Sequence, residues 1–190
     1  MLPLDRDTAT ALIDALAART GIVATVGAGG KKSTLYRLLQ AHRAIGTPRI
    51  ALTSTVQIAT GPEALGAETV IIDGDSETAV TRTLGQKGVF LFAGPPTKPG
   101  RFSGLPEPVI TDLHQQGDFA VSLVKADGAR MRMIKAPSDR EPALPENVTT
   151  LLPIVSARVF GRPLDERLAH RLDRLPQVID ADRDLSLIHI

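Results

Sequence analysis

The sequence predicts a three-layer α/β protein, in which a doubly wound, mostly parallel sheet lies between two layers of helices. Two observations predict this fold. Short apolar runs alternate with amphipathic stretches along the chain, as strands alternate with helices around a parallel sheet. The first apolar run leads through a glycine-rich turn into a helix, as at the start of a βαβ unit. The chain has 190 residues, enough for about one domain, and we expect residues 1–182 to form it.

Each expected element is marked by its apolar residues and by its ends. Leu12, Ile13 and Leu16 share one face of the first helix. Gly21 and Gly46 stand where the first two helices would stop. Short continuous apolar runs mark strands that are buried on both faces. We expect helices at residues 8–19, 33–44, 75–84 (with Asp75 or Ser76 as the N-cap), 109–116 and 164–172, and strands at residues 21–26, 49–53, 69–72, 89–92, 119–124 and 150–155.

Two proline-rich stretches interrupt this alternation. Residues 94–108 contain five prolines and residues 136–145 contain three, so we expect both to be irregular surface loops. Loops of this length in an α/β domain are more often functional than idle. Residues 183–190 follow no pattern set by the preceding segment, and we expect them to be a non-native tail.

The composition excludes several classes of protein. With 22 Lys and Arg against 21 Asp and Glu, and 3% aromatic residues, the chain lacks both the charge excess and the stacking platforms of a nucleic-acid binder. The absence of cysteine excludes disulfides, thiolate metal sites and thiol nucleophiles. No apolar run approaches the roughly 20 residues that span a bilayer. We therefore expect a cytoplasmic protein that binds neither nucleic acid nor a membrane.

The most informative motif is the segment GAGGKKST between the first strand and the second helix. Glycines let backbone N–H groups converge on a phosphate, a helix start adds about half a positive charge, a lysine neutralises phosphate, and a hydroxyl can ligate Mg²⁺. The spacing resembles the short G-x-x-G-K-T-T loop of Mur ligases, and it predicts a P-loop NTPase-like site for ATP, or another nucleoside triphosphate, with Mg²⁺. The expected phosphate-binding residues are Gly27, Gly29, Gly30, Lys31, Lys32, Ser33 and Thr34.

Two registers of this loop are compatible with the sequence. In the first, Lys31 contacts phosphate and Lys32 occupies the hydroxyl position. In the second, Lys32 contacts phosphate and Ser33 follows it directly. A glycine turn with solvated lysines is the alternative that needs no ligand.

A second group of polar residues follows the strand expected at residues 119–124. Asp127 lies where nucleoside triphosphatases place the carboxylate that holds Mg²⁺, so we expect it to be the catalytic and metal-binding carboxylate. The alternative is an Asp-Gly turn. Arg130, Arg132 and Lys135 bring three positive charges to one loop, where they would clamp phosphate or another anion, or simply be solvated.

Hydroxyl groups end the second strand at the same expected edge of the sheet. Thr53, with Ser54 and Thr55 after it, would ligate Mg²⁺ together with Ser33, although a helix cap is an equally good role. His42 falls on the apolar face of its helix and is expected in the core. No histidines have metal-ligand spacing, and the G-x-S-x-G motif of a serine hydrolase is absent.

Four separated blocks of the sequence together resemble the YqeC family of selenium-dependent hydroxylase accessory proteins. The blocks are GAGGKKST, LTST, VKADGARMRMIKAPSDREPALP and VSARVFGRPLDERLAHR, within residues 22–171. The resemblance implies a P-loop-like α/β protein in the maturation of molybdenum hydroxylases that carry a labile selenium, with such an enzyme or its cofactor as partner. The residues that align with the family pattern are Gly27, Gly29, Gly30, Lys31, Thr53, Asp127, Gly128, Arg130, Lys135, Pro137, Glu141 and Pro142.

The chain departs from that pattern at Lys32, Lys125 and Arg140, where the family has Thr, Glu and His. Lys125 lies next but one to Asp127, so strand alternation would place both on one side and let the cation compete with Mg²⁺. Nucleotide binding is therefore expected more firmly than hydrolysis. The leading hypothesis is an ATP-binding accessory protein, an ATPase or phosphoryl-transfer enzyme. The alternatives are a non-catalytic module for an anionic cofactor, such as a pterin phosphate, and a Mur-like ligase or kinase, whose second-substrate pocket residues 94–108 would line.

Overall fold

A six-stranded parallel sheet forms the centre of the computed structural model, which describes residues 3–59, 65–74 and 76–179. Its strand order is β10-β1-β8-β2-β5-β4. The strands are β1 (Gly21–Gly27), β2 (Arg49–Ser54), β3 (Ile58–Ala59), β4 (Ala67–Ile71), β5 (Gly88–Ala93), β6 (Pro96–Lys98), β7 (Arg101–Phe102), β8 (Val121–Lys125), β9 (Ile134–Lys135), β10 (Val148–Ile154) and β11 (Ala169–His170). The helices are α1 (Arg6–Ala15), α2 (Lys31–Ile45), α3 (Glu77–Thr83), α4 (Glu107–Gln116) and α5 (Leu175–Ile179), with short 3₁₀ turns η2 (Ala157–Val159) and η3 (Leu172–Arg174).

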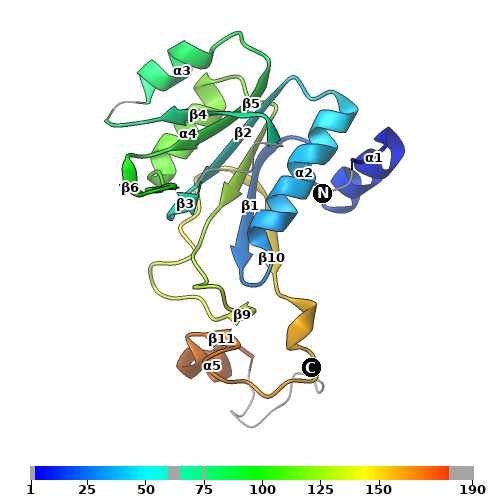
Figure 1. Ribbon diagram of the computed structural model, residues 1–190, viewed down its shortest axis with the longest axis vertical. Coiled ribbons are helices and arrows are strands. Elements are labelled where there is room, and N and C mark those ends of the chain that lie inside the picture. The colour runs from blue at the N-terminus through cyan, green and yellow to red at the C-terminus, as the bar shows by residue number, and fades with distance from the viewer. Residues whose placement is uncertain (1–2, 60–64, 75, 180–190) are drawn as a thin grey trace.

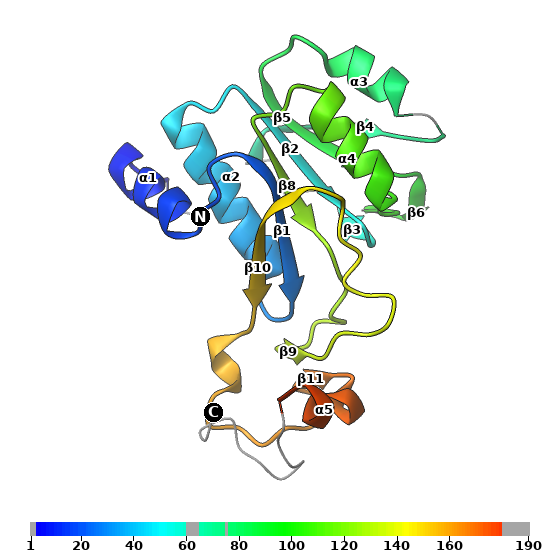
Figure 2. The same ribbon diagram turned by 180° about the vertical axis from the view of Figure 1, so that it is seen from behind.

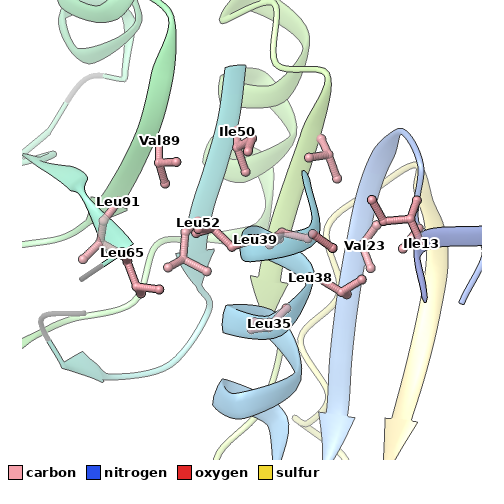
Figure 3. Close-up of a cluster of buried hydrophobic side chains, with 14 of the residues drawn as sticks. Ile13, Val23, Leu35, Leu38, Leu39, Ile50, Leu52, Leu65, Val89 and Leu91 are labelled. Atoms are coloured by element: carbon pink, nitrogen blue, oxygen red, sulfur yellow. The ribbon is translucent and has the colours of Figure 1, made fainter. Parts of the chain in front are cut away.

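Helices cover both faces of this sheet, so the expected three layers are present. Leu35 and Leu39 of α2 pack in one buried cluster with Ile50 and Leu52 of β2, and α1 joins that cluster through Ile13 (Figure 3). Figure 1 shows α1 and α2 together on this face. All six predicted strands of the sheet are confirmed, with bounds within two residues of those expected.

The opposite face carries the second core. Phe90 and Phe92 of β5 alternate with the residues that face α2, and they pack with Ile110 and Leu113 of α4. Phe119 meets both phenylalanine rings edge to face, with its centroid 5.5 Å from that of Phe92. Figure 2 shows α3 and α4 on this side of the sheet.

The first helix differs from its prediction at both ends. It begins at Arg6, because the Asp5 carboxylate accepts a hydrogen bond from the backbone N–H of Thr8 and caps it. It ends at Ala15, and Gly21, expected as its stop, is instead the first residue of β1. Gly46 does cap α2 in the left-handed conformation, as predicted.

The helix expected at residues 164–172 is wrong. Leu168 and Ala169 are buried, but their backbone N–H groups turn back to Asp165, and Ala169 then starts β11. That strand pairs in parallel with β9, Ala169 opposite Ile134. Apolar side chains four residues apart favour a helix. Here a turn and a strand bury Leu168 and Ala169 instead, next to β9, which lies more than thirty residues earlier in the chain.

The stretch at 94–108 is more regular than expected, because β6 and β7 form an antiparallel pair that β3 extends. The stretch at 136–145 is irregular, as predicted, apart from one bridge between Ser138 and Glu141. For the third helix, Ser76 occupies the N-cap position without a side-chain capping bond, while Asp75 lies outside the described residues, as does the expected tail at 183–190.

His42 lies fully buried in the core, as predicted, with its two ring nitrogens 2.9 Å from the Thr47 hydroxyl and the Ala18 carbonyl. In the part of the chain that the structure describes, no helix is long and apolar enough to cross a membrane.

Arg49, at the start of β2, is a buried cation that the sequence analysis did not single out. Its guanidinium donates to the carbonyls of Gly117, Thr83 and Gln86, and it lies over the ring of Phe119 at 4.6 Å from the centroid. One side chain thereby joins the ends of α3 and α4 to the sheet.

We expect Arg49→Ala to lower the free energy of unfolding by about 3 kcal/mol, because buried carbonyls lose a charged donor and a cavity opens. The exposed Arg6 of α1 provides the matched control, and Arg6→Ala should change stability far less. Urea unfolding followed by circular dichroism measures both. Equal stabilities for the two variants would show that Arg49 does not join the layers.

Candidate functional site

The site lies where β1, β8 and β10 end, at one edge of the parallel sheet. The glycine-rich loop follows β1 and leads into α2, whose first residue is Lys31. Gly27 and Gly29 have positive φ of +88° and +82°. A Cβ on Gly27 would lie 2.3 Å from the Ile154 carbonyl oxygen, and one on Gly29 would lie 2.8 Å from the backbone nitrogen of Ser156, just after β10. The close approach of the loop to the end of β10 therefore requires glycine at both positions.

Asp127, two residues after β8, is the centre of the site. Its side chain is 2% exposed, and its Oδ2 accepts a hydrogen bond from the Gly27 N–H at 2.9 Å. The Lys31 Nζ lies 2.8 Å from Oδ1, and the Lys135 Nζ lies 2.9 Å from Oδ2. Lys31 also donates to the Gly27 carbonyl. We name Lys31, Asp127 and Lys135 the Lys–Asp–Lys cluster. The structure thus brings together four residues that the sequence placed in the site.

A second carboxylate extends this cluster. Lys135 donates to the Glu141 Oε2 at 2.8 Å and to the Gly128 carbonyl at 2.6 Å. Arg171 donates to the same Glu141 oxygen at 2.7 Å. Burial would raise the pKa of Glu141, but the hydrogen bonds from Lys135, Arg171 and the Gly128 N–H outweigh it and lower the pKa to about 2. From the sequence, Glu141 was expected only as a match to a family pattern, and Arg171 was not expected in the site.

Lys125 does not pair with Asp127, contrary to the expected competition. Its ammonium donates to the Gln57 carbonyl at 3.1 Å, while Asp127 is paired with Lys31 and Lys135. Burial, together with the positive charge of Lys31, lowers the pKa of Lys125 to about 8. Lys125 therefore adds positive potential to the site.

The remaining loop residues lie at the open start of α2. Lys32 and Ser33 are exposed, whereas the Lys31 side chain is 5% exposed. The Thr34 hydroxyl donates to the Gly30 carbonyl at 3.3 Å. The first N–H groups of a helix have no partner within it, so the loop presents donors together with the Lys32 side chain.

The expected Mg²⁺ ligands are not assembled around Asp127. The Thr53 hydroxyl donates to the Phe92 carbonyl on the neighbouring β5, which directs it into the sheet. Asp127 is surrounded by two ammonium groups and an N–H donor, all of which would repel a divalent cation. Within the described residues, no group of three His, Asp or Glu side chains could hold a metal ion. The side chains present in this arrangement do not fit Mg²⁺ on Asp127.

Of the three expected anion-clamping residues, only Lys135 joins the cluster. Arg130 is exposed, and it lines a separate hollow of about 380 Å³ together with Arg132, His170, Arg171, Glu166, Ala169, Leu172 and Asp173.

An apolar cavity of about 540 Å³ opens directly beside the Lys–Asp–Lys cluster. Gly27, Asp127 and Lys135 line the part that borders the cluster. The rest of the wall is apolar and consists of Val26, Ile134, Pro137, Pro142, Pro153, Ile154, Val155, Val159 and Phe160. No residue of the 94–108 stretch lines this cavity, although that stretch was expected to line the second-substrate pocket of a Mur-like ligase or kinase.

Fold and site together define a parallel α/β protein with a glycine loop at a helix start, and a buried Lys–Asp–Lys cluster beside an apolar cavity. The family described as YqeC protein matches residues 23–173, and the chain belongs to this family. A curated relative from Escherichia coli (strain K12), "Uncharacterized protein YqeC", is 25% identical over 169 residues. That alignment covers 89% of this chain and 64% of the relative, so the chain spans less than two thirds of the relative's length. No solved structure matches the chain.

Asp127→Ala should lower the free energy of unfolding by about 3–5 kcal/mol, because two buried ammonium groups lose their counter-ion. Adding Lys31→Met removes one of these stranded charges, so the double variant should lose less than the sum of the two single losses. Chemical denaturation of the four proteins gives the coupling energy. The exposed Asp73 is the control, and Asp73→Ala should leave stability nearly unchanged. Strict additivity would contradict the pairing.

The low pKa of Glu141 predicts a pH-dependent contribution to stability. The pKa of about 2 in the folded protein lies below the ordinary glutamate pKa of 4.5, so the ionised group stabilises the fold above pH 4.5. This contribution is lost as the pH falls from 4.5 toward 2. The stability difference between the unaltered protein and Glu141→Gln should therefore be largest near pH 7 and smaller at pH 3.5. A difference that is constant over this range would argue against the ion pairs of Glu141.

Proposed function

We propose that this member of the YqeC family binds the phosphate chain of a nucleoside triphosphate, ATP in the first instance, on its glycine loop. One observation carries the proposal: the loop at the start of α2 admits no side chain at Gly27 or Gly29, and it holds the buried ammonium of Lys31. A helix start with unpaired N–H groups and a lysine within it is an anion site.

The charges around the loop support a polyanion as ligand. Lys31, Lys32, Lys125 and Lys135 bring four ammonium groups, while Asp127 and Glu141 bring two carboxylates. Burial and, to a lesser extent, the positive charge of Lys31 lower the pKa of Lys125 to about 8. A phosphate chain would supply negative charge to balance the four ammonium groups. Its terminal group would compete with Asp127 for Lys31, so binding would loosen the Lys–Asp–Lys cluster.

The same arrangement supports binding more than turnover. A nucleoside triphosphate normally brings Mg²⁺, which neutralises its phosphate oxygens. Asp127 is engaged by two cations and the Thr53 hydroxyl is bonded into the sheet. We therefore propose a nucleotide-binding accessory protein in which Asp127 orients Lys31 and Lys135, rather than a fast ATPase.

The biological role that we propose rests on the family. The resemblance of the four sequence blocks supports a function in the maturation of selenium-dependent molybdenum hydroxylases in the cytoplasm, with such an enzyme or its cofactor as partner. The apolar cavity beside the cluster favours one alternative, a non-catalytic module that binds an anionic cofactor such as a pterin phosphate. A Mur-like ligase or kinase would place its second substrate in that cavity, and not at residues 94–108.

Replacing Lys31 by Ala should weaken ATP binding by tenfold or more, since a charged contact to phosphate contributes roughly 1.5–3 kcal/mol. Lys32→Ala, the matched control in the same loop, should weaken it less, because the exposed Lys32 is screened by solvent. Isothermal titration calorimetry with MgATP measures both, after circular dichroism has verified folding. A larger loss for Lys32→Ala would establish the other register, and no binding by the unaltered protein would refute the proposal.

A further inference from the structure

The apolar cavity and the glycine loop share a wall. Gly27 ends β1 at the loop, and it also lines the cavity together with Asp127 and Lys135. A volume of about 540 Å³ is within the range of small-molecule sites. One continuous site therefore has a cationic end at the start of α2 and an apolar end beside the last residues of β10.

The apolar end is built from rigid side chains. Pro153 and Val155 lie at the end of β10, and Pro137 and Pro142 face it from the irregular stretch at 136–145. Proline rings and β-branched side chains have few rotamers, so walls made of them lose little entropy on binding. Such walls suit a planar ring.

Phe160 stands at the mouth of this cavity with 60% of its surface exposed. The preceding 3₁₀ turn fixes its position, because the Ser156 hydroxyl accepts from the Arg158 N–H and Val159 is buried, with 1% exposed. Val155, with 48% exposed, lies in the same wall. An exposed aromatic ring in the wall of a cavity offers a face on which a planar ring can stack.

We infer that this cavity binds the planar heterocyclic ring of a ligand whose phosphate chain lies on the glycine loop, with Phe160 stacked on that ring. The inference rests on the proposed function and deepens it by assigning the place of the base. The continuity of the cavity with the cationic loop supports a phosphorylated heterocycle as the occupant, because each end of such a molecule meets a matching surface.

The test compares ATP with tripolyphosphate, which carries the phosphates without a ring. The unaltered protein should bind ATP more tightly than tripolyphosphate. Phe160→Ala should weaken ATP binding about tenfold, the usual scale of one aromatic stack, and leave tripolyphosphate binding unchanged. Phe160→Trp should retain ATP binding. Leu84→Ala, at an exposed apolar residue after α3, is the control and should change neither.

The outcomes separate the two proposals. If tripolyphosphate and ATP bind equally well and Phe160→Ala has no effect, the inference is overturned while the phosphate site stands. An equal loss for both ligands in Phe160→Ala also overturns it, because the effect would then be structural. If analytical ultracentrifugation shows that Phe160→Ala dissociates an oligomer without affecting ATP, the cavity is an interface between copies and the inference fails. If the unaltered protein binds neither ligand, both proposals fail.

Discussion

The burial of one carboxylate, Asp127, between two ammonium groups is the interaction on which the site depends. A buried charge is costly unless it is paired and hydrogen-bonded, and Asp127 meets that demand with partners from three different elements. Gly27 comes from the end of β1, Lys31 from the start of α2, and Lys135 from β9. The need to neutralise this carboxylate therefore holds the glycine loop, the helix and the β9 segment in one arrangement, which Glu141 and Arg171 then extend.

Much of the sheet could be predicted from the sequence, because strands such as β1, β5 and β8 are short, largely apolar runs between breakers. The convergence of the glycine loop and Asp127 could also be predicted, since both follow strands that end at one edge. Contacts between residues that lie far apart in the sequence could not be predicted. The residues next to Glu141 and Arg171 in the sequence do not distinguish these side chains from solvated charges. The segment that turns at Asp165 has the same spacing of apolar residues as a helix, so its sequence predicts a helix. Arg49 was missed for a related reason, because its carbonyl partners are contributed by residues far along the chain.

The position of Lys125 links the electrostatics of the site to its chemistry. In this chain a lysine ends β8 and donates to the Gln57 carbonyl. A base at this position shifts the local balance toward anions and away from divalent metals. Burial, and after it the charge of Lys31, lowers the pKa of Lys125.

The place of β1 in the sheet has a consequence for how the chain folds during synthesis. Both neighbours of β1 are made about a hundred or more residues later, since it pairs with β8 through Val23 and Leu123 and with β10 through Val23 and Thr150. Until those segments emerge from the ribosome, the first apolar strand has two open edges, a state prone to misassociation. The glycine loop can close against Ile154 only after β10 has paired. The loop therefore reaches its final arrangement only after β10, more than a hundred residues further along the chain, has been made.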